Sequence, residues 1–302
     1  MTGFGDARQE FVQKRAALAA EMGATVAKRL ADHQVAVGAA KRQVAGGAPR
    51  PLAVLAIGDS WFDYPITDAQ LPFFVDNSIV GPGHLPALGA PPAHVLSLAE
   101  HGQAMTQIMG LKKQRAMIAE LANPANWFTG KPDAILISGG GDDTAGDQFA
   151  LFLDPVARRL DVEAYDGVMD FICAAYRKLF RFRDFYAAGV PVFGHCYDYS
   201  MADGRGIPLA FSGPWLRPAF DQFGFSEDQR LAAMREAVDR MHDRLAELAA
   251  RPDNGFTLID TRGTLRLSED PPLGYANELH PFAAGFAALA RKFAEALGIA
   301  AG

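Results

Sequence analysis

The chain has 302 residues, of which 49% are hydrophobic and 21% are charged, as in ordinary globular proteins with a sizeable core. The formal net charge of -6 excludes a surface built mainly for nucleic acid, so we expect no nucleic-acid partner. No apolar run approaches the roughly 20 residues that a transmembrane helix needs, so we expect no membrane span.

The two cysteines, Cys173 and Cys196, are too few for a disulfide framework and form no CxxC metal motif. Both lie among apolar residues, which is typical of buried thiols in a reducing compartment. The first residues, MTGFGDARQEF, lack the basic and apolar regions of a signal peptide. We therefore expect a cytoplasmic protein.

Residues 6–45 are rich in Ala, Gln, Lys and Arg, with apolar residues near helical spacing. The stretch GGAPRP at 46–51 ends this pattern. We predict an N-terminal helical extension over 1–47, which could be a packing arm or a homo-oligomer contact.

The apolar run Leu52 to Ile57 predicts a buried strand, and it ends in Gly58, Asp59 and Ser60. This order places a small hydroxyl at the carboxyl end of a parallel strand, where open α/β sheets hold their ligands. The alternative is that Asp59 and Ser60 only cap the next helix.

Four more strands and four long helices follow in alternation. We expect strands at 95–98, 133–138, 190–196 and 256–260, and helices at 103–122, 163–188, 227–250 and 282–297. This alternation predicts an α/β fold, a three-layer α/β/α sandwich with a mostly parallel sheet, over 48–302. Loop elaborations at 66–94, 144–162 and 197–225 interrupt it, and substrate specificity would lie in the first and third.

Polar and glycine-rich segments stand at the ends of several predicted elements. They are the GDS at 58–60, Gly102, the GGGDD at 139–143 and the NELHP at 277–281. The carboxyl ends of parallel strands meet at one edge of a sheet, so these segments can converge. A serine near a histidine and backbone N–H donors is the minimum set for acyl transfer.

The order of these blocks resembles that of the SGNH/GDSL hydrolases, and the resemblance covers residues 52–290. The nucleophile motif GxSxG is absent, which argues against the α/β-hydrolase class. The resemblance implies a flavodoxin-like sheet order and an esterase that needs no cofactor. It also implies Ser60 as nucleophile, His280 as general base, and the N–H groups of Ser60 and Gly102 in an oxyanion hole.

Two positions depart from the family pattern. Asp142 stands where the family has an asparagine that donates to the oxyanion, and Asn277 stands where it has the aspartate that orients the histidine. Asn277 can accept a hydrogen bond from an imidazole but lacks the charge that stabilises the imidazolium. The third member therefore stays open, with Glu278 adjacent and Asp59 or Asp260 able to approach.

Asp142 poses an electrostatic problem if it faces a developing oxyanion. At about 4 Å and an effective dielectric near 20, the repulsion is on the order of 4 kcal/mol. Asp142 must then be protonated, be neutralised by a cation, or point elsewhere. Burial beside Asp143 could raise its pKa and keep it neutral.

Several other side chains could belong to the site or to the core. His195 and Asp198 follow a predicted strand and could support the site or make structural hydrogen bonds. Four aromatic residues could line an acyl or sugar pocket or pack in the core: Trp61, Phe62, Tyr64 and Trp215. Three histidines have no ligand-like spacing: His84, His94 and His101.

We predict a serine hydrolase that cleaves carboxylic esters through an acyl-enzyme, acting on a small-molecule or acylated substrate such as a carbohydrate or lipid ester. One alternative is a metal-dependent phosphoesterase that uses Asp59, Asp63, Asp142 and Asp143 with His195 and His280. No paired HxH or HxxxH spacing supports a metal site, so we predict none. The other alternative is a catalytically impaired binding protein on the same fold.

Overall fold

The computed structural model describes residues 24, 26–64, 78–207, 213–268, 270 and 273–299. Five parallel strands form the central sheet in the order β2-β1-β3-β6-β7. Their bounds are Ala53–Gly58 (β1), His94–Ser97 (β2), Ala134–Ser138 (β3), Val192–His195 (β6) and Phe256–Ile259 (β7). The predicted strands are confirmed to within two residues.

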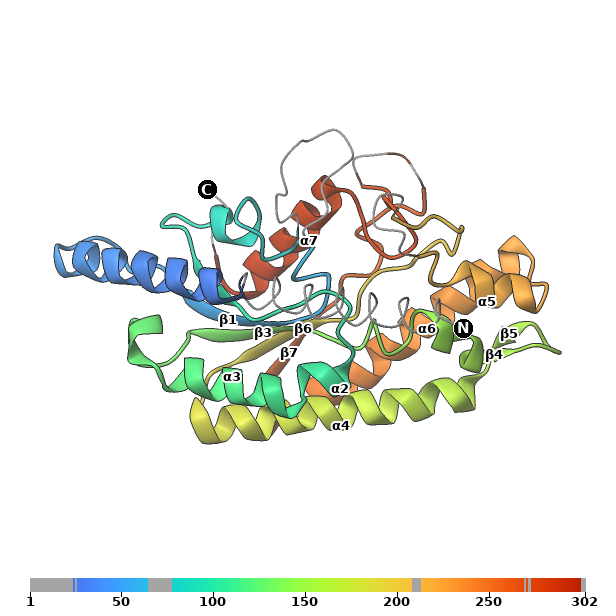
Figure 1. Ribbon diagram of the computed structural model, residues 1–302, viewed down its shortest axis with the longest axis horizontal. Helices are drawn as coiled ribbons and strands as arrows, with labels where there is room; N and C mark the ends of the chain where they lie inside the picture. The colour runs from blue at the N-terminus through green and yellow to red at the C-terminus, as the bar shows by residue number, and fades with distance from the viewer. Residues whose placement is uncertain are drawn as a thin grey trace, which may run out of the picture.

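Helices cover both faces of this sheet, as Figure 1 shows. Helix α7 (Ala283–Ala296) lies on one face. The long helices on the other face are α3 (Leu111–Ala122), α4 (Val162–Tyr186) and α6 (Glu227–Ala249). Strands β1 and β3 are buried along their whole length because both faces are covered. The predicted three-layer α/β/α fold is confirmed.

The strand order reverses between β1 and β3. From β1 the chain goes to β2 on one side and then crosses to β3 on the other. Gly58 pairs with Ser138, so both strands end side by side. Ligands bind at such switch points in open α/β sheets, and Ser60 lies just beyond this one.

The single helix predicted over 103–122 is wrong, because the chain forms α2 (Met105–Ile108) and then α3. Gly110 interrupts it with an extended backbone and caps α3. A side chain at this position would collide with the carbonyl oxygen of Thr106, 2.7 Å from an added Cβ. Because Gly110 has no side chain, its backbone can lie this close to Thr106, and the chain can turn between α2 and α3.

The predicted loop elaborations contain short elements of their own. These are 3₁₀ helix η1 (Leu85–Leu88), 3₁₀ helix η3 (Asp147–Phe152), the antiparallel pair β4 (Leu153–Asp154) and β5 (Arg159–Leu160), and α5 (Arg217–Gln222). Two further 3₁₀ turns are η2 (Pro124–Asn126) and η4 (Pro252–Asn254). Residues 66–77 and 208–212 of the expected loops lie outside the described residues.

Residues 26–45 of the N-terminal extension are helical, and the helix packs on the sheet domain. Val37 and Ala40 are buried, and the buried His33 places Nε2 2.9 Å from the carbonyl oxygen of Asn126. Most of the extension before residue 26 lies outside the described residues. Its use as an oligomer contact stays a prediction.

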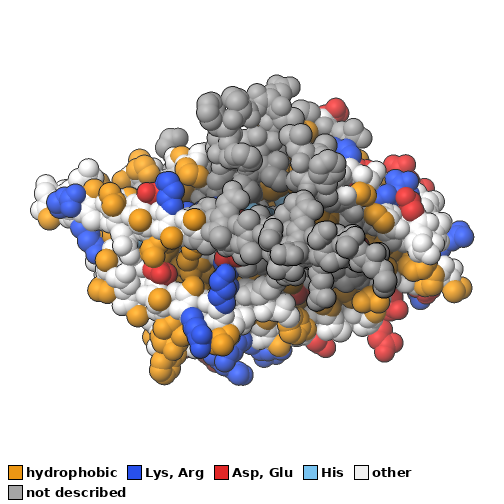
Figure 2. Space-filling view, in the orientation of Figure 1, with side chains coloured by type: hydrophobic (Ala, Val, Ile, Leu, Met, Phe, Trp, Pro, Cys, Tyr) orange, Lys and Arg blue, Asp and Glu red, His pale blue; other side chains and the backbone are white. Residues whose placement is uncertain are grey.

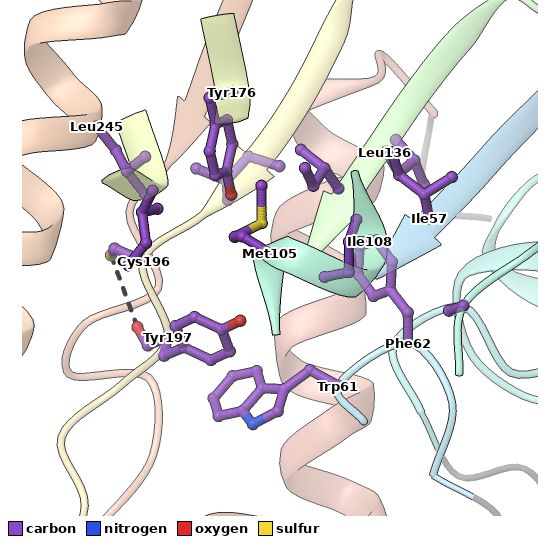
Figure 3. Close-up of a cluster of buried hydrophobic side chains, with 14 of the residues drawn as sticks. Ile57, Trp61, Phe62, Met105, Ile108, Leu136, Tyr176, Cys196, Tyr197 and Leu245 are labelled. Atoms are coloured by element: carbon purple, nitrogen blue, oxygen red, sulfur yellow. Dashed lines mark hydrogen bonds between the residues drawn. The ribbon is translucent and has the colours of Figure 1, made fainter. Parts of the chain in front are cut away.

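Aromatic side chains fill the carboxyl end of the sheet (Figure 3). Trp61 and Tyr197 pack edge to face with ring centroids 5.1 Å apart. Cys196 lies beside them, and both cysteines are free and buried. This packing holds the segments after β1 and β6 against each other.

The described residues on the visible face include apolar, basic and acidic side chains. Within the described residues, no helix is long and apolar enough to cross a membrane. On the face drawn in Figure 2, described Lys and Arg side chains lie among apolar and acidic ones rather than forming one continuous basic surface.

We predict that Gly58→Ala strongly destabilises the fold. Gly58 has φ of +151°, and an added Cβ would overlap the carbonyl oxygen of Ser138. Strain and overpacking together should cost about 2–5 kcal/mol in the free energy of unfolding, measured with urea. Gly47→Ala is the control, because Gly47 has φ of +95° with no atom within 4 Å of an added Cβ. It should cost only about 1–2 kcal/mol, and equal losses would contradict the steric argument.

Candidate active site

The structure brings a serine and a histidine together across 220 residues of sequence. Ser60 lies in the turn after β1, and His280 lies just before α7. His280 Nε2 is 2.7 Å from Ser60 Oγ, a hydrogen-bonding distance. Ser60 is half-buried, whereas His280 is buried. A hydroxyl can therefore pass its proton directly to the imidazole.

Asn277 holds the other side of the imidazole. Its Oδ1 lies 3.0 Å from His280 Nδ1 and also accepts the backbone N–H groups of Leu279 and His280, each at 3.0 Å. The atom that accepts these N–H groups must be the oxygen, so His280 Nδ1 carries the proton. Nε2 is then the free base that faces Ser60.

Two aromatic side chains fix the plane of the imidazole. Tyr64 stacks on His280 with ring centroids 4.4 Å apart, and its hydroxyl accepts a 3.1 Å hydrogen bond from Asn277 Nδ2. Trp215 packs edge to face with His280, with ring centroids 6.0 Å apart. These contacts leave the imidazole little freedom to rotate away from Ser60.

Burial without a carboxylate partner makes His280 a weak base. Desolvation, and next the nearby His101, lower the pKa of His280 to about 3. Asn277 supplies an acceptor but no negative charge to oppose the burial term. The imidazole is therefore neutral over almost the whole physiological range, and so is ready to accept a proton.

Asp59 anchors the turn that presents Ser60. Its Oδ1 accepts the N–H of Trp61 at 3.0 Å and the hydroxyl of Ser138 at 2.6 Å, and its Oδ2 accepts the hydroxyl of Tyr197. Burial, and next the charge of Asp142, raise the pKa of Asp59 to about 7, while the three donors favour the carboxylate. This carboxyl therefore positions the loop that carries Ser60 rather than orienting His280.

His195 belongs to the same hydrogen-bond network as Asp59 and Ser138. Its Nδ1 accepts the N–H of Tyr197 at 3.1 Å, so Nε2 carries the proton and donates to Ser138 Oγ at 2.9 Å. Burial lowers the pKa of His195 to about 3. Ser138, His195 and Asp59 resemble a second triad, but Ser138 and His195 have no exposed surface. They cannot meet a substrate.

Asp142 lines the same cavity as Ser60. Burial, and next the neighbouring Asp143, raise the pKa of Asp142 to about 6, while His101 acts in the opposite direction. Asp143 accepts the N–H of Met105 at 2.8 Å, and burial raises its pKa. The structure thus offers two ways to neutralise Asp142, a proton or the His101 cation.

Gly102 lies in a turn that the N-terminal helix helps to hold. Asp63 accepts the N–H of His101 at 3.1 Å, contacts its Nδ1 at 3.2 Å, and pairs with Arg29 of residues 26–45. The hydrogen bond to Asp63, above all, raises the pKa of His101. Gly102 itself has φ of +72°. Within the described residues, no hydrogen bond uses the N–H of Gly102 or that of Ser60.

Glu278 does not contact His280; it binds the backbone of neighbouring residues. Its carboxylate is buried. It accepts hydrogen bonds of 2.6–2.9 Å from four backbone N–H groups, those of Gly204, Trp215, Leu216 and Arg217. A carboxylate that receives these four donors joins Gly204 and residues 215–217 to the loop that carries His280. It thereby also holds Trp215 against the imidazole.

Asp198 and Asp260 also lie away from the imidazole. The Asp198 carboxylate accepts the N–H groups of Tyr199, Gly263 and Leu265 at 2.7–2.8 Å. Asp260 pairs with Arg262, which holds the pKa of Asp260 at about 2. Both make structural contacts, so the residue that orients His280 is Asn277.

A partly enclosed cavity of about 80 Å³ begins at Ser60. Residues from the turn after β1, the loop after β3 and helix α6 line it, among them Ser60, Trp61, Asp142, Met234, Val238 and Met241. Within the described part of the chain, no three His, Cys, Asp or Glu side chains are grouped as metal ligands.

Comparison with known proteins finds similarity in structure alone. No protein-family model matches the sequence, and no curated protein does. The lipase Lip_vut3 from a goat rumen metagenome aligns over 82% of this chain and 98% of its own, with a TM-score of 0.51 and 15% identity. The chain has the fold of the SGNH/GDSL hydrolases.

Two other solved structures are similar at lower scores. An extracellular lipase from Streptomyces rimosus is 20% identical, with 80% of this chain and 98% of that chain covered and a TM-score of 0.49. A member of the lipolytic G-D-S-L family from Veillonella parvula is 14% identical, with coverages of 80% and 96% and a TM-score of 0.42.

Sequence reasoning missed several residues that build the site on this SGNH/GDSL fold. Ser138 is the last residue of a predicted strand, and its pairing with Gly58 depends on strand order. Tyr64 was an expected pocket or core residue; it is buried in the core, and its stacking on the imidazole was not predicted. Arg29 lies in the extension, whose sequence carries no sign of a contact with Asp63. Only tertiary structure reveals these roles.

We predict that Asn277→Asp preserves or raises activity. A carboxylate behind the imidazole favours its protonated form, so the pKa of His280 should rise by about one unit or more. The acid limb of kcat/KM, which reports the free enzyme, should move to higher pH by that amount. Asn277→Ala should be less active than wild type. If the acid limb of kcat/KM does not move in a folded Asn277→Asp protein, residue 277 does not set the pKa of His280.

We predict that Asp142→Asn is at least as active as wild type near neutral pH. The wild-type carboxyl ionises as pH rises through about 6, and its charge then opposes a developing oxyanion. Wild-type kcat/KM should therefore fall with rising pH, and the variant should fall less. Asp143→Asn provides a comparison at the neighbouring carboxyl. A variant slower than wild type at every pH would show that the carboxylate itself is used.

Proposed function

We propose that this protein is a serine hydrolase that cleaves carboxylic esters through an acyl-enzyme. The observation that carries the proposal is the 2.7 Å contact between Ser60 Oγ and His280 Nε2, with Asn277 fixing the proton on Nδ1. The similarity in fold to a lipase also supports an ester-cleaving function.

In the first half-reaction, Ser60 Oγ attacks the ester carbonyl carbon while its proton passes to His280 Nε2. The tetrahedral intermediate then breaks its bond to the alkoxide oxygen, which takes the proton from Nε2 and leaves as the alcohol. The acyl group remains on Ser60. Water repeats the sequence with the same imidazole, releasing the carboxylic acid and restoring the Ser60 hydroxyl.

The asparagine does not by itself prevent this chemistry. Replacing a triad aspartate by asparagine costs about 10⁴-fold in kcat through the wrong imidazole tautomer. Here two backbone N–H groups turn the Asn277 oxygen toward His280, so the productive tautomer is the one present. What is missing is the charge that stabilises the imidazolium, and that loss lowers the strength of the base.

Backbone donors support the oxyanion. The N–H groups of Ser60 and Gly102 are unused within the described residues, and each such donor is worth about 10²–10³ in kcat. A protonated Asp142 at the cavity wall would add a third donor.

We predict that Ser60→Ala abolishes hydrolysis of a short p-nitrophenyl ester while the fold stays intact. The variant removes the atom that attacks, and the hydroxyl fills no core space because Ser60 is half-buried. Ser138→Ala is the matched control, because Ser138 is also hydrogen-bonded to a histidine but is inaccessible. It should retain more activity than Ser60→Ala. Near-full activity in a folded Ser60→Ala protein would rule out the serine mechanism.

A further inference from the structure

The turn that carries Gly102 is held by hydrogen bonds of its neighbours rather than by packing on the glycine itself. Gly102 is exposed, and within the described residues no atom lies within 4 Å of a Cβ added to it. Its N–H makes no hydrogen bond to these residues either. The direction of this N–H therefore depends on how residues 99–101 are held.

One carboxylate joins this turn to the N-terminal helix. Asp63 Oδ2 accepts the backbone N–H of His101 at 3.1 Å, and Oδ1 pairs with the guanidinium of Arg29. Only 9% of the Asp63 side chain is exposed, so its charge needs close partners to be stable there. His101 directly precedes Gly102. The Arg29 cation thus helps to fix the peptide that bears the Gly102 N–H.

Arg29 also holds the turn directly. Its Nη1 donates to the carbonyl oxygen of Ala99 at 3.3 Å while Nη2 pairs with Asp63. Asp63 follows β1 and Ala99 follows β2, so one guanidinium bridges the turns after two neighbouring strands. The planar guanidinium suits such a bridge because it has several N–H groups in fixed directions, whereas a lysine ammonium is a compact point charge.

A lysine on the opposite side keeps the rest of the turn in place. Lys113 of α3 donates to the carbonyl oxygen of Leu98 and pairs with Glu100 at 2.8 Å. Because these contacts do not involve Arg29, its removal should leave the chain folded and displace mainly residues 101 and 102.

We propose that Arg29 is a positioning residue for catalysis, which acts through Asp63 to aim the N–H of Gly102 at the oxyanion. The N-terminal helix is then a part of the active site rather than an appendage of the α/β domain. The inference rests on the proposed serine esterase function, in which both half-reactions pass through a tetrahedral state with a negative oxygen.

The test measures kcat and KM of Arg29→Ala with a short p-nitrophenyl ester. A misdirected donor weakens the tetrahedral states more than the bound ester, so kcat should fall about tenfold or more while KM changes less than about threefold. Arg29→Lys keeps the charge but not the bridge, so its kcat should lie between those of wild type and Arg29→Ala.

Lys41→Ala is the matched control on the same helix. Lys41 also ties this helix to the domain, but it donates to the carbonyl oxygen of Pro124 in η2, at 3.0 Å, rather than to residues 99–102. Its kcat should equal that of wild type. Arg29→Ala combined with Asp63→Asn should be no slower than the slower of the two single variants, because both changes act through one carboxylate.

A second measurement does not depend on turnover. The His101 amide donates to Asp63, so its hydrogen exchange, followed by mass spectrometry of a peptide spanning 98–104, should be faster in Arg29→Ala than in wild type. Exchange of the same peptide should be unchanged in Lys41→Ala. If Arg29→Ala folds poorly, Arg29→Lys carries both measurements.

The outcomes separate this inference from the proposed function. Wild-type kcat in the folded Arg29 variants, an equal loss in Lys41→Ala, or unchanged exchange would overturn the inference, while hydrolysis that depends on Ser60 would keep the esterase function. If wild type does not cleave this ester, the rate at which a phosphonate labels Ser60 replaces kcat, since the phosphonyl oxygen occupies the same hole. If neither hydrolysis nor labelling depends on Ser60, both the function and the inference fail.

Discussion

The close contact between the ends of β1 and β3 determines the rest of the site. Gly58 and Ser138 pair at the edge of the sheet, and the Asp59 carboxyl accepts the Ser138 hydroxyl. Because His195 and Tyr197 join the same network, three strand ends are tied to the turn that carries Ser60. A fully buried carboxyl with three donors is costly to disturb, so Ser60 is presented from a rigid support.

A second constraint is that the site has an amide, Asn277, and a carboxyl, Asp142, at the two positions where the family pattern has a carboxyl and an amide. The amide of Asn277 lies behind the imidazole, and the carboxyl of Asp142 lies in front, at the cavity. Relative to the pattern that the sequence resembles, one negative charge has moved from the base to the substrate side. The consequence is a neutral, weakly basic imidazole and a carboxyl whose protonation decides whether it assists or opposes an oxyanion.

Much of this arrangement follows from sequence because its signals are local. The apolar run before Gly58 and the glycine-rich segment after 133–138 each mark a strand end, and parallel strands bring such ends together. Asn277 and His280 also lie three residues apart, so a short loop joins them. The break at Gly110 was not predicted, because it depends on how closely two helices approach.

Other parts of the site could not be predicted because their partners are far apart in sequence. Glu278 accepts N–H groups from Gly204 and residues 215–217, and Arg29 reaches Asp63 from the N-terminal helix. Acidic residues that accept backbone N–H groups leave no periodic pattern. The cavity is likewise formed by loops and α6 together, and only their packing gives its volume.

The central claim is that His280 activates Ser60 as a nucleophile. Its most direct measurement is covalent labelling by a serine-reactive phosphonate, with the modified peptide identified by mass spectrometry. We expect a single adduct on Ser60 in wild type and labelling slowed by orders of magnitude in a folded His280→Ala protein. The absence of an adduct, an adduct on another residue, or equal labelling rates in the two proteins would contradict the account.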